Sequence, residues 1–178
     1  MIEPCYVRIA FISMFTICLS ACAASLQGTV SAISYNGHPQ SPLFFVISTD
    51  SFSVTERNIS ALIEAKLTEK GFQKANSLEL ANVGVIYKYS IDQSGSIHSV
   101  PAGQGSTTFT TYPRHFQIAL IDLQKSKIPE KIEFLWQGEV YSAGTSRNIA
   151  LIAPSFIEVL FENYGKTVSN KNFSKQIE

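Results

Sequence analysis

Apolar side chains alternate with polar ones along several stretches of the chain, and this period of two is typical of strands with one buried face. The stretch VGVIYKYSI at 83–91 shows the alternation most clearly. Residues 115–122 and 132–144 repeat it on either side of a short polar turn, so they predict an antiparallel hairpin. The run LFFVIS at 43–48 is apolar almost throughout and predicts a strand that is buried on both faces.

Two other stretches carry apolar residues at helical spacing. The first begins at Ser53, which has the spacing of a capping box with Glu56, and stops at Gly71. Its apolar residues fall on one face, which is typical of a helix that packs against a core. In the second stretch Pro154 suits the first turn of a helix, so we expect the regular helix to begin near Pro154 and to end at Gly165.

The order of these elements is strand, helix, strand, long polar stretch, two strands and helix. It predicts an α+β fold with a mostly antiparallel sheet of about four to six strands and two helices packed on one face. A chain of 178 residues has room for one such domain, which we place at 43–165. We predict a signal peptide at 1–21, a tether with a weak first strand at 22–42, and a polar tail at 166–178.

The polar stretch 92–113 is long for a hairpin loop and is rich in glycine, serine and threonine. We expect a mobile excursion here, with short strands at 96–100 and 107–112. Aromatic residues follow it along the chain, and aromatic side chains on strands usually belong to the core.

The alternative is that some of these aromatic residues are exposed. In that case Tyr112, Trp136 and Tyr141 form a candidate binding surface for a peptide, a glycan or a partner protein, and the stretch 92–113 forms its rim.

The charge of the chain excludes one class of partner. Its 14 lysines and arginines balance 14 acidic residues, so the formal net charge is zero, and the basic residues are scattered. Nucleic-acid-binding domains concentrate positive charge on one surface, so we predict no nucleic-acid partner. A polybasic patch that would bind anionic lipids is missing for the same reason.

The three cysteines, Cys5, Cys18 and Cys22, all fall within the first 22 residues. A chain that starts at Cys22 therefore has no second cysteine with which to form an internal disulfide or a cysteine-based zinc cluster. We predict no cofactor and no metal.

The N-terminal segment has the features of an export signal. Residues 9–21 form an apolar run of signal-peptide length, which is too short to span a bilayer. The run leads into LSAC at 19–22, which resembles the lipobox of bacterial lipoproteins. In that family the cysteine thiol takes a diacylglycerol, and cleavage exposes the cysteine amine, which is commonly acylated as well. The resemblance implies that Cys22 is lipidated and anchors the protein to a membrane.

The residues around the lipobox also bear on location. In enterobacterial lipoproteins an Asp after the cysteine signals retention in the inner membrane, and Ala23 stands at that position here. The resemblance therefore implies a cell-envelope protein in the outer membrane that faces the periplasm. Ordinary secretion is the alternative, because a cut after Ala23 fits the small-x-small rule and would discard Cys22.

The domain itself carries a second resemblance. The segments LTEKGF, ANVGVIYKY and FQIALIDLQKSKIPEKIEFLWQGE, with Trp136 beside Gly138, are followed by an apolar helix. Between Leu43 and Tyr164 this series resembles small bacterial envelope lipoproteins built on one domain of unknown function. Asn82 departs from the acidic residue expected before the strand. The resemblance implies a lipid-anchored α+β domain in the envelope and carries no established activity. The tether, the neutral charge and the missing catalytic set lead us to predict a non-catalytic binding or structural domain in the periplasm, with an envelope protein or a glycan as partner.

Catalytic chemistry has weak candidates in this sequence. The histidines His38, His98 and His115 lack the paired spacing of metal ligands. An alternative function is a periplasmic hydrolase that uses His98 or His115 with Asp92 or Asp122, which would require these side chains to meet. Another is a carrier of a small apolar ligand, held in a pocket between helix and sheet. We assign no catalytic residue.

The lipid anchor can be tested by metabolic labelling. Cells that express the protein and are fed a fatty-acid analogue should label the wild type, which should fractionate with membranes. The Cys22→Ser variant should take up no label and leave the membrane fraction, because it lacks the thiol that receives the lipid. Labelling that persists in Cys22→Ser would contradict the assignment of the anchor.

Overall fold

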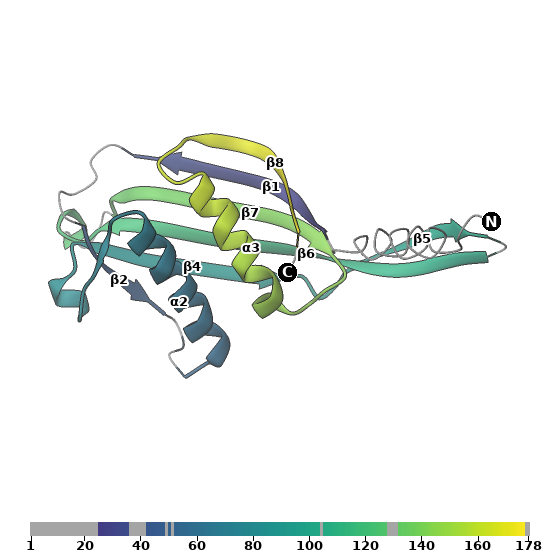
Figure 1. Cartoon of the computed structure of the whole chain (residues 1–178), viewed down its shortest axis with the longest axis horizontal. Coiled ribbons are helices and arrows are strands. Elements are labelled where there is room, and N and C mark those ends of the chain that lie inside the picture. Colours follow the sequence, from purple (N-terminus) through teal and green to yellow (C-terminus); the bar gives the residue numbers. More distant parts are fainter. Residues whose placement is uncertain are drawn as a thin grey trace, which may run out of the picture.

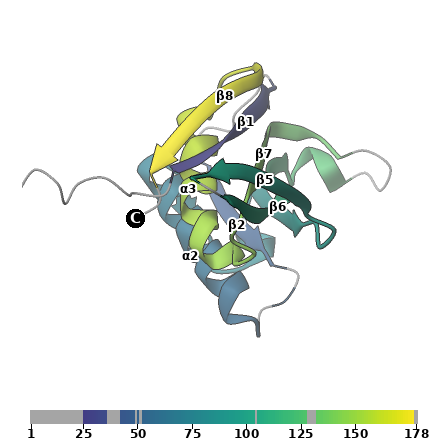
Figure 2. The same ribbon diagram turned by 90° about the vertical axis from the view of Figure 1, so that its right-hand side faces the viewer.

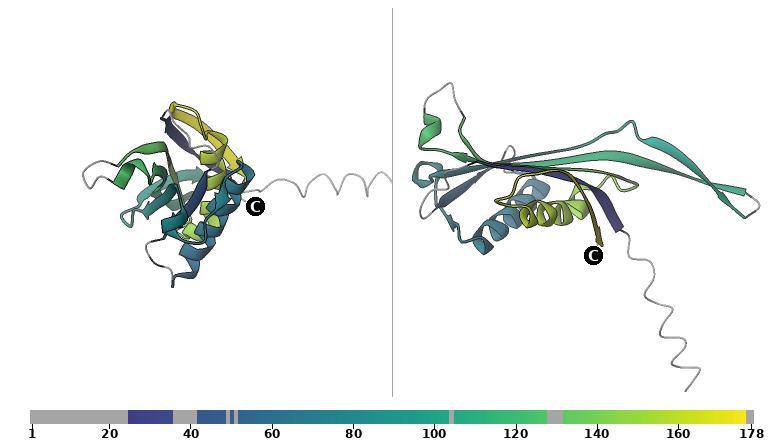
Figure 3. Two further views of the ribbon diagram at one scale, coloured as in Figure 1. Left: turned by 90° about the vertical axis from the view of Figure 1, so that its left-hand side faces the viewer. Right: turned by 90° about the horizontal axis from the view of Figure 1, so that it is seen from above.

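A computed structural model describes residues 25–35, 42–48, 50, 52–103, 105–127 and 132–176. Within these residues eight strands form one twisted sheet and two α-helices lie against it (Figure 1). Seen from above, both helices lie on the same side of the sheet (Figure 3). The view along the long axis also places the helices together on one side (Figure 2). The opposite face of the sheet carries no α-helix in the described part of the chain.

The strands follow an order that combines both directions. From edge to edge it is β3-β2-β4-β6-β7-β1-β8, with β5 paired to β6 beyond the end of β4. β2 runs parallel to β3 and β4, and the other neighbours are antiparallel. The strands are β1 (Ser25–Ser34), β2 (Leu43–Ile47), β3 (Gln73–Lys74), β4 (Val83–Ile91), β5 (Ser96–Ala102), β6 (Gly105–Asp122), β7 (Phe134–Gly144) and β8 (Val168–Gln176). The helices are α2 (Val54–Glu69), α3 (Ile149–Glu162) and the short 3₁₀ turns η2 (Leu78–Leu80) and η3 (Lys125–Lys127).

The predicted fold class is therefore wrong in the size and character of the sheet. We expected about four to six mostly antiparallel strands, whereas the sheet has eight and is mixed. The parallel part arises because the chain crosses from β2 through α2 to β4, which lies beside β2 in the same direction. Such a crossover returns the chain to the same end of the sheet, so the two strands it joins are parallel. Asn82 supports this step, because its side-chain oxygen accepts a hydrogen bond of 2.8 Å from the Leu43 backbone N–H.

One extra strand comes from polar sequence that we assigned to a tail, whereas the short strands expected at 96–100 and 107–112 lie within β5 and β6. Residues 168–176, expected within a polar tail, form β8, which pairs with β1 along the edge of the sheet. Only Val168 and Phe173 of β8 pack against the core, so the strand has too few apolar residues to show an alternation. The weak strand expected within 22–42 lies in β1, and the excursion expected at 92–113 contains β5 and the first part of β6.

Both predicted helices are present, with one correction. The Ser53 side chain accepts a hydrogen bond of 3.3 Å from the Glu56 backbone N–H, which confirms the predicted cap of the first helix. α3 begins at Ile149, capped by Asn148, and not near Pro154 as we predicted. The helix begins at its Asn148 cap, and Pro154 lies inside it instead of in its first turn.

The core lies between the helices and one face of the sheet. Trp136, Phe116 and Phe156 are fully buried there, with Phe44 of β2 and Ile63 of α2. Each large side chain of this kind contributes roughly 1.5–3 kcal/mol when it leaves water. The helix side of the sheet therefore supplies the apolar burial that holds the domain together.

Gly138 leaves no room for a side chain in this core. A Cβ atom at Gly138 would lie 2.6 Å from Cη2 of Trp136 and 2.8 Å from Cδ2 of Leu160. Trp136 and Gly138 lie two positions apart on the same face of β7, so the indole lies over the glycine. The order Trp-Gln-Gly is thus a packing requirement of the core.

Gly138→Ala should lower the free energy of unfolding by about 2 kcal/mol, because overpacking a filled core costs this much. Urea denaturation followed by Trp136 fluorescence measures the change. Gly105→Ala is the matched control, since its Cβ would meet nothing closer than the Ala102 carbonyl oxygen at 3.9 Å. An equal loss of stability in both variants would contradict the packing role.

Candidate functional site

The face of the sheet that points away from α2 and α3, which we call the open face, is the largest surface on which side chains from several strands meet. From Gln137 onward the odd-numbered residues of β7, such as Glu139 and Tyr141, point to this face, whereas Trp136, Gly138 and Val140 point to the helices. Side chains in the middle of the open face, such as Gln117, Ala119 and Gln137, are half-buried because no second layer covers them. This one-sided cover makes the open face the region to search for a site.

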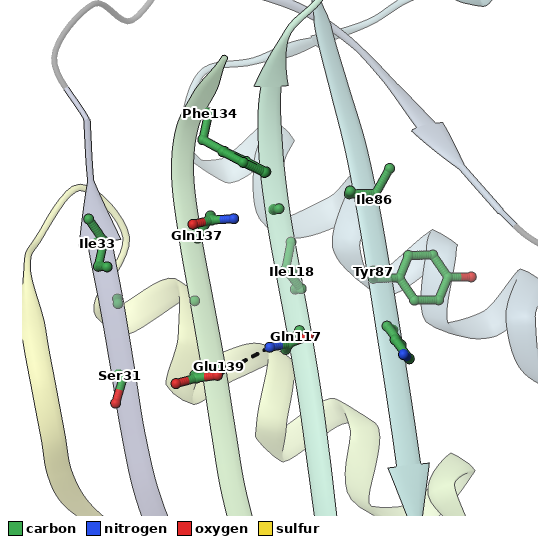
Figure 4. Close-up of a pocket in the computed structure, with 13 residues that line it drawn as sticks. Ser31, Ile33, Ile86, Tyr87, Gln117, Ile118, Phe134, Gln137 and Glu139 are labelled. Atoms are coloured by element: carbon green, nitrogen blue, oxygen red, sulfur yellow. Dashed lines mark hydrogen bonds between the residues drawn. The ribbon is translucent and has the colours of Figure 1, made fainter. Parts of the chain in front are cut away.

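A hollow of about 380 Å³ lies in the open face. It crosses β1, β7, β6 and β4, and Figure 4 shows its side chains standing on these strands. Apolar and polar groups alternate around it, as in a surface that contacts a partner through both. Its lining includes Ile33, Ile86, Ala119, Phe134, Gln137 and Glu139.

The small side chain of Ala119 on β6 lines the hollow. Ala119 lies opposite Gln137 of β7 and Ile86 of β4 in the strand register. Larger neighbours stand around it, with Ile33 47% exposed on β1 and Phe134 half-buried at the start of β7. The hollow is therefore made by a small residue surrounded by larger ones on a curved sheet.

A polar cluster of β6 and β7 side chains borders the hollow, on the side toward the C-terminal end of β7. The Gln117 amide donates to Oε2 of Glu139 at 3.1 Å, and the Tyr141 hydroxyl donates to the same oxygen at 3.3 Å. His115 stacks on Tyr141 with ring centroids 4.2 Å apart, and its Nε2 lies 3.6 Å from Glu139 Oε2. Burial, followed by the charge of Glu139, raises the pKa of Tyr141 above its ordinary value. At neutral pH this phenol is therefore a neutral donor.

The three residues of the predicted binding surface are not brought together. Tyr141 is 46% exposed on the open face. Tyr112 lies at the start of the paired region of β6 and β7, where the Arg147 guanidinium stands 5.2 Å from its ring centroid. Trp136 is completely buried on the helix side, so it does not line a surface. The aromatic residues of this sequence divide between core and surface by strand parity, which composition alone does not reveal.

The residues considered for acid–base chemistry have other partners. Asp92 Oδ1 accepts hydrogen bonds from the backbone and hydroxyl of Ser94, at 2.8 and 2.5 Å. Asp122 Oδ1 accepts from the backbone N–H groups that follow it in the turn, both at 3.0 Å. His98 Nε2 lies 2.8 Å from the Thr111 hydroxyl. Both carboxylates thus have the role of turn caps.

No group of three or more histidines, cysteines, aspartates or glutamates among the described residues has the geometry to hold a metal ion. His38 lies outside the described residues, as does Cys22. Across the same described ranges, no helix combines the length and apolarity needed to cross a bilayer.

A second polar cluster was missed by sequence analysis. Glu56 is buried beneath the first turn of α2, where its carboxylate accepts a hydrogen bond from the Tyr87 hydroxyl of β4. The Tyr87 hydroxyl also lies 3.0 Å from the Ser60 hydroxyl. Burial, and then the hydrogen bond to Glu56, raises the pKa of Tyr87. This cluster fastens the start of α2 to the sheet, and the capping box at Ser53 was its only local signal.

The pocket expected between helix and sheet for an apolar ligand is occupied by side chains. Fully buried Phe44, Ile63 and Phe156 fill this layer. A second hollow, of about 460 Å³, lies in the groove between α2 and α3, where Leu62 and Leu151 are exposed. The hollows described here thus lie on the outside of the two layers.

Comparisons with known proteins identify the fold. No protein-family model matches the chain, and no curated protein matches it in sequence. Among solved structures, a PDZ domain protein from Parabacteroides distasonis is similar over 92% of this chain, with 15% identity and a TM-score of 0.56. A DUF4136 family protein from Bacteroides thetaiotaomicron is similar over 78% of this chain and 97% of its own, with 16% identity and a TM-score of 0.50.

The low sequence identities and partial coverage limit the similarity to the fold. A PelC dodecamer from Paraburkholderia phytofirmans covers 75% of this chain and 94% of its own at 15% identity, but its TM-score of 0.44 is too low to indicate a shared fold. The chain spans 42% of the length of the PDZ domain protein. The likeness is one of fold, and it agrees with the resemblance to small bacterial domains of unknown function.

Proposed function

We propose that this protein is a lipid-anchored lipoprotein of the bacterial cell envelope, and that its domain is a non-catalytic binding module that holds an envelope protein on the open face. The observation that carries the binding role is the hollow of about 380 Å³ in the face of the sheet that no helix covers. Its anchor would be Cys22, in the outer membrane, with the domain in the periplasm.

The surface around the hollow supports a protein partner. Interfaces between proteins join an apolar centre to a polar rim and contain aromatic residues. Here Ile33, Ile86 and Phe134 supply apolar contact, while the Gln117–Glu139–Tyr141 cluster supplies hydrogen-bonding groups at one border. Ile33 and Tyr141 are exposed on the open face, and a bound partner would remove these side chains from water.

The anchor is supported by the sequence before β1. LSAC at 19–22 has the order of a lipobox, and only Ala23 and Ala24 separate Cys22 from the first residue of β1. Each buried CH₂ of an acyl chain contributes ~0.8 kcal/mol, and two or more chains hold a protein stably at a bilayer. An anchor of this kind requires no membrane-binding patch on the domain.

The engagement of the candidate acid–base residues supports a non-catalytic role. A hydrolase of the kind considered above needs a histidine within hydrogen-bond reach of an aspartate. Asp92 and Asp122 are instead held by the turns that they cap, and His115 lies against Glu139 and Tyr141 on the open face.

The binding role can be tested by crosslinking in intact cells. A photo-crosslinking phenylalanine analogue placed at Ile33 should form an adduct with another envelope protein, because Ile33 borders the hollow. Ala119→Trp in the same background should abolish the adduct, because the indole fills the hollow from its floor. Immunoblotting and mass spectrometry of the adduct measure both outcomes.

Ala61→Trp provides the matched control, since Ala61 is exposed on α2 at the opposite side of the domain. It should leave the adduct unchanged. An adduct that survives Ala119→Trp, or a failure to form any protein adduct from Ile33, would refute the open face as the binding site.

A further inference from the structure

A two-stranded arm projects from one end of the sheet. β5 pairs with the first part of β6, from Ser96 opposite Thr111 to Ala102 opposite Gly105. The pairing of β6 with β7 begins only at Tyr112, and its pairing with β4 begins at Arg114. Residues 96–103 and 105–111 therefore leave the domain as a narrow ribbon, which we call the arm (Figures 1 and 3).

The composition of the arm differs from that of the domain. Residues 93–112 contain no lysine, arginine, aspartate or glutamate, so all the formal charges of the chain lie outside them. Ile97 is 73% exposed, and Val100 and Phe109 are also exposed. A ribbon of two strands is marginally stable alone in water, and exposed apolar side chains add to its need for a covering surface.

The arm and the start of β1 lie at the same end of the sheet. Gly28 of β1 and Arg114 of β6 both stand opposite Ser142 of β7. β1 and β6 run in the same direction, since each is antiparallel to β7. Three residues earlier on each strand are Ser25 and Thr111, so the first residue of β1 is level with the base of the arm.

Two lengths then limit where a membrane can lie. Three Cα–Cα steps join Cys22 to Ser25, so this connection reaches at most about 11 Å. From Thr111 to Gly105 the arm extends six residues, which is roughly 20 Å at the rise of a strand. The arm is longer than the connection that would tether the domain.

Only some orientations of a domain anchored at Cys22 are compatible with these lengths. If the strands stand upright on the bilayer, the arm tip passes the level of Cys22 and enters the lipid. If the strands lie along the bilayer, the arm lies on its surface. Pointing the arm away from the bilayer would turn the body of the domain, which carries the charges, into it, and burying those charges is unfavourable.

We propose that the arm contacts the phospholipid bilayer and sets the orientation of the domain on it. This inference rests on the proposed lipid anchor at Cys22. The uncharged tip, with Val100 and Pro101 on β5, meets the headgroups and the outer acyl region, while the body stays in water. The arm thereby holds the open face at a fixed angle to the membrane.

Lipid quenching tests the contact. The lipidated protein with Val100→Trp is purified and reconstituted into phosphatidylcholine vesicles whose acyl chains are brominated or unbrominated. Native Trp136 is completely buried, so the wild type gives the background and also reports the folded core. Brominated lipid should remove most of the additional emission of Val100→Trp.

Tyr35→Trp is the control, because Tyr35 is exposed and lies ten residues along from Ser25, roughly 33 Å away. Its emission should be the same in both kinds of vesicle. Unquenched Val100→Trp, or equal quenching at Val100 and Tyr35, would overturn the proposed contact of the arm.

Failure of the anchor is distinguished on the same samples. Mass spectrometry of the N-terminal peptide shows whether Cys22 carries lipid, and an unlipidated Cys22 overturns the proposed anchor. In that case the chain beginning at Cys22 is coupled through its thiol to a maleimide-bearing lipid, and the quenching is repeated. Quenching of Val100→Trp alone then supports the contact of the arm, and its absence refutes it.

Discussion

The structure depends on a sheet that is buried on one face only. Phe44, Phe116 and Trp136 on the helix side meet Ile63 and Phe156 from α2 and α3, and this layer holds the apolar surface that keeps the chain folded. The chain has no third layer within the described residues, so the open face must remain compatible with water. Its mixture of glutamine, glutamate, histidine and half-buried apolar residues follows from that constraint.

One-sided burial also explains how the hollow can form without a local sequence motif. A two-sided sheet would pack large residues against Ala119, whereas here the small residue leaves a hollow between Ile33, Ile86 and Gln137. The strands that supply these residues are far apart in the sequence and meet only through the order of the sheet. The same order places the start of β1 level with the base of the arm, with β7 between β1 and β6.

Much of the fold was accessible from local sequence. The alternation at 83–91 and the capping box at Ser53 correspond to β4 and α2, because in both cases one element buries one face. β8 was not accessible, since an edge strand with only Val168 and Phe173 turned inward resembles a polar tail. The parallel pairing of β2 with β4 was missed because direction depends on the crossover and not on the residues of either strand.

The candidate site was less accessible than the fold. Trp136 and Tyr141 look alike in composition, and only the register of β7 assigns the first to the core and the second to the open face. The hollow depends on cross-strand neighbours such as Ala119 and Gln137, which no spacing along the chain brings together. The polar stretch 92–113 was recognised as long for a loop, but its place at the same end of the sheet as Ser25 follows only from the strand register.

The central claim is that the open face is a surface covered by a partner in the cell. No cysteine follows Cys22 in the sequence, so single cysteines placed along β7 report on each face separately. We expect Gln137→Cys to react quickly with a thiol reagent in the purified protein and slowly in intact cells, and Val140→Cys to react slowly in both. Equal reactivity of Gln137→Cys in purified protein and in cells would contradict the claim.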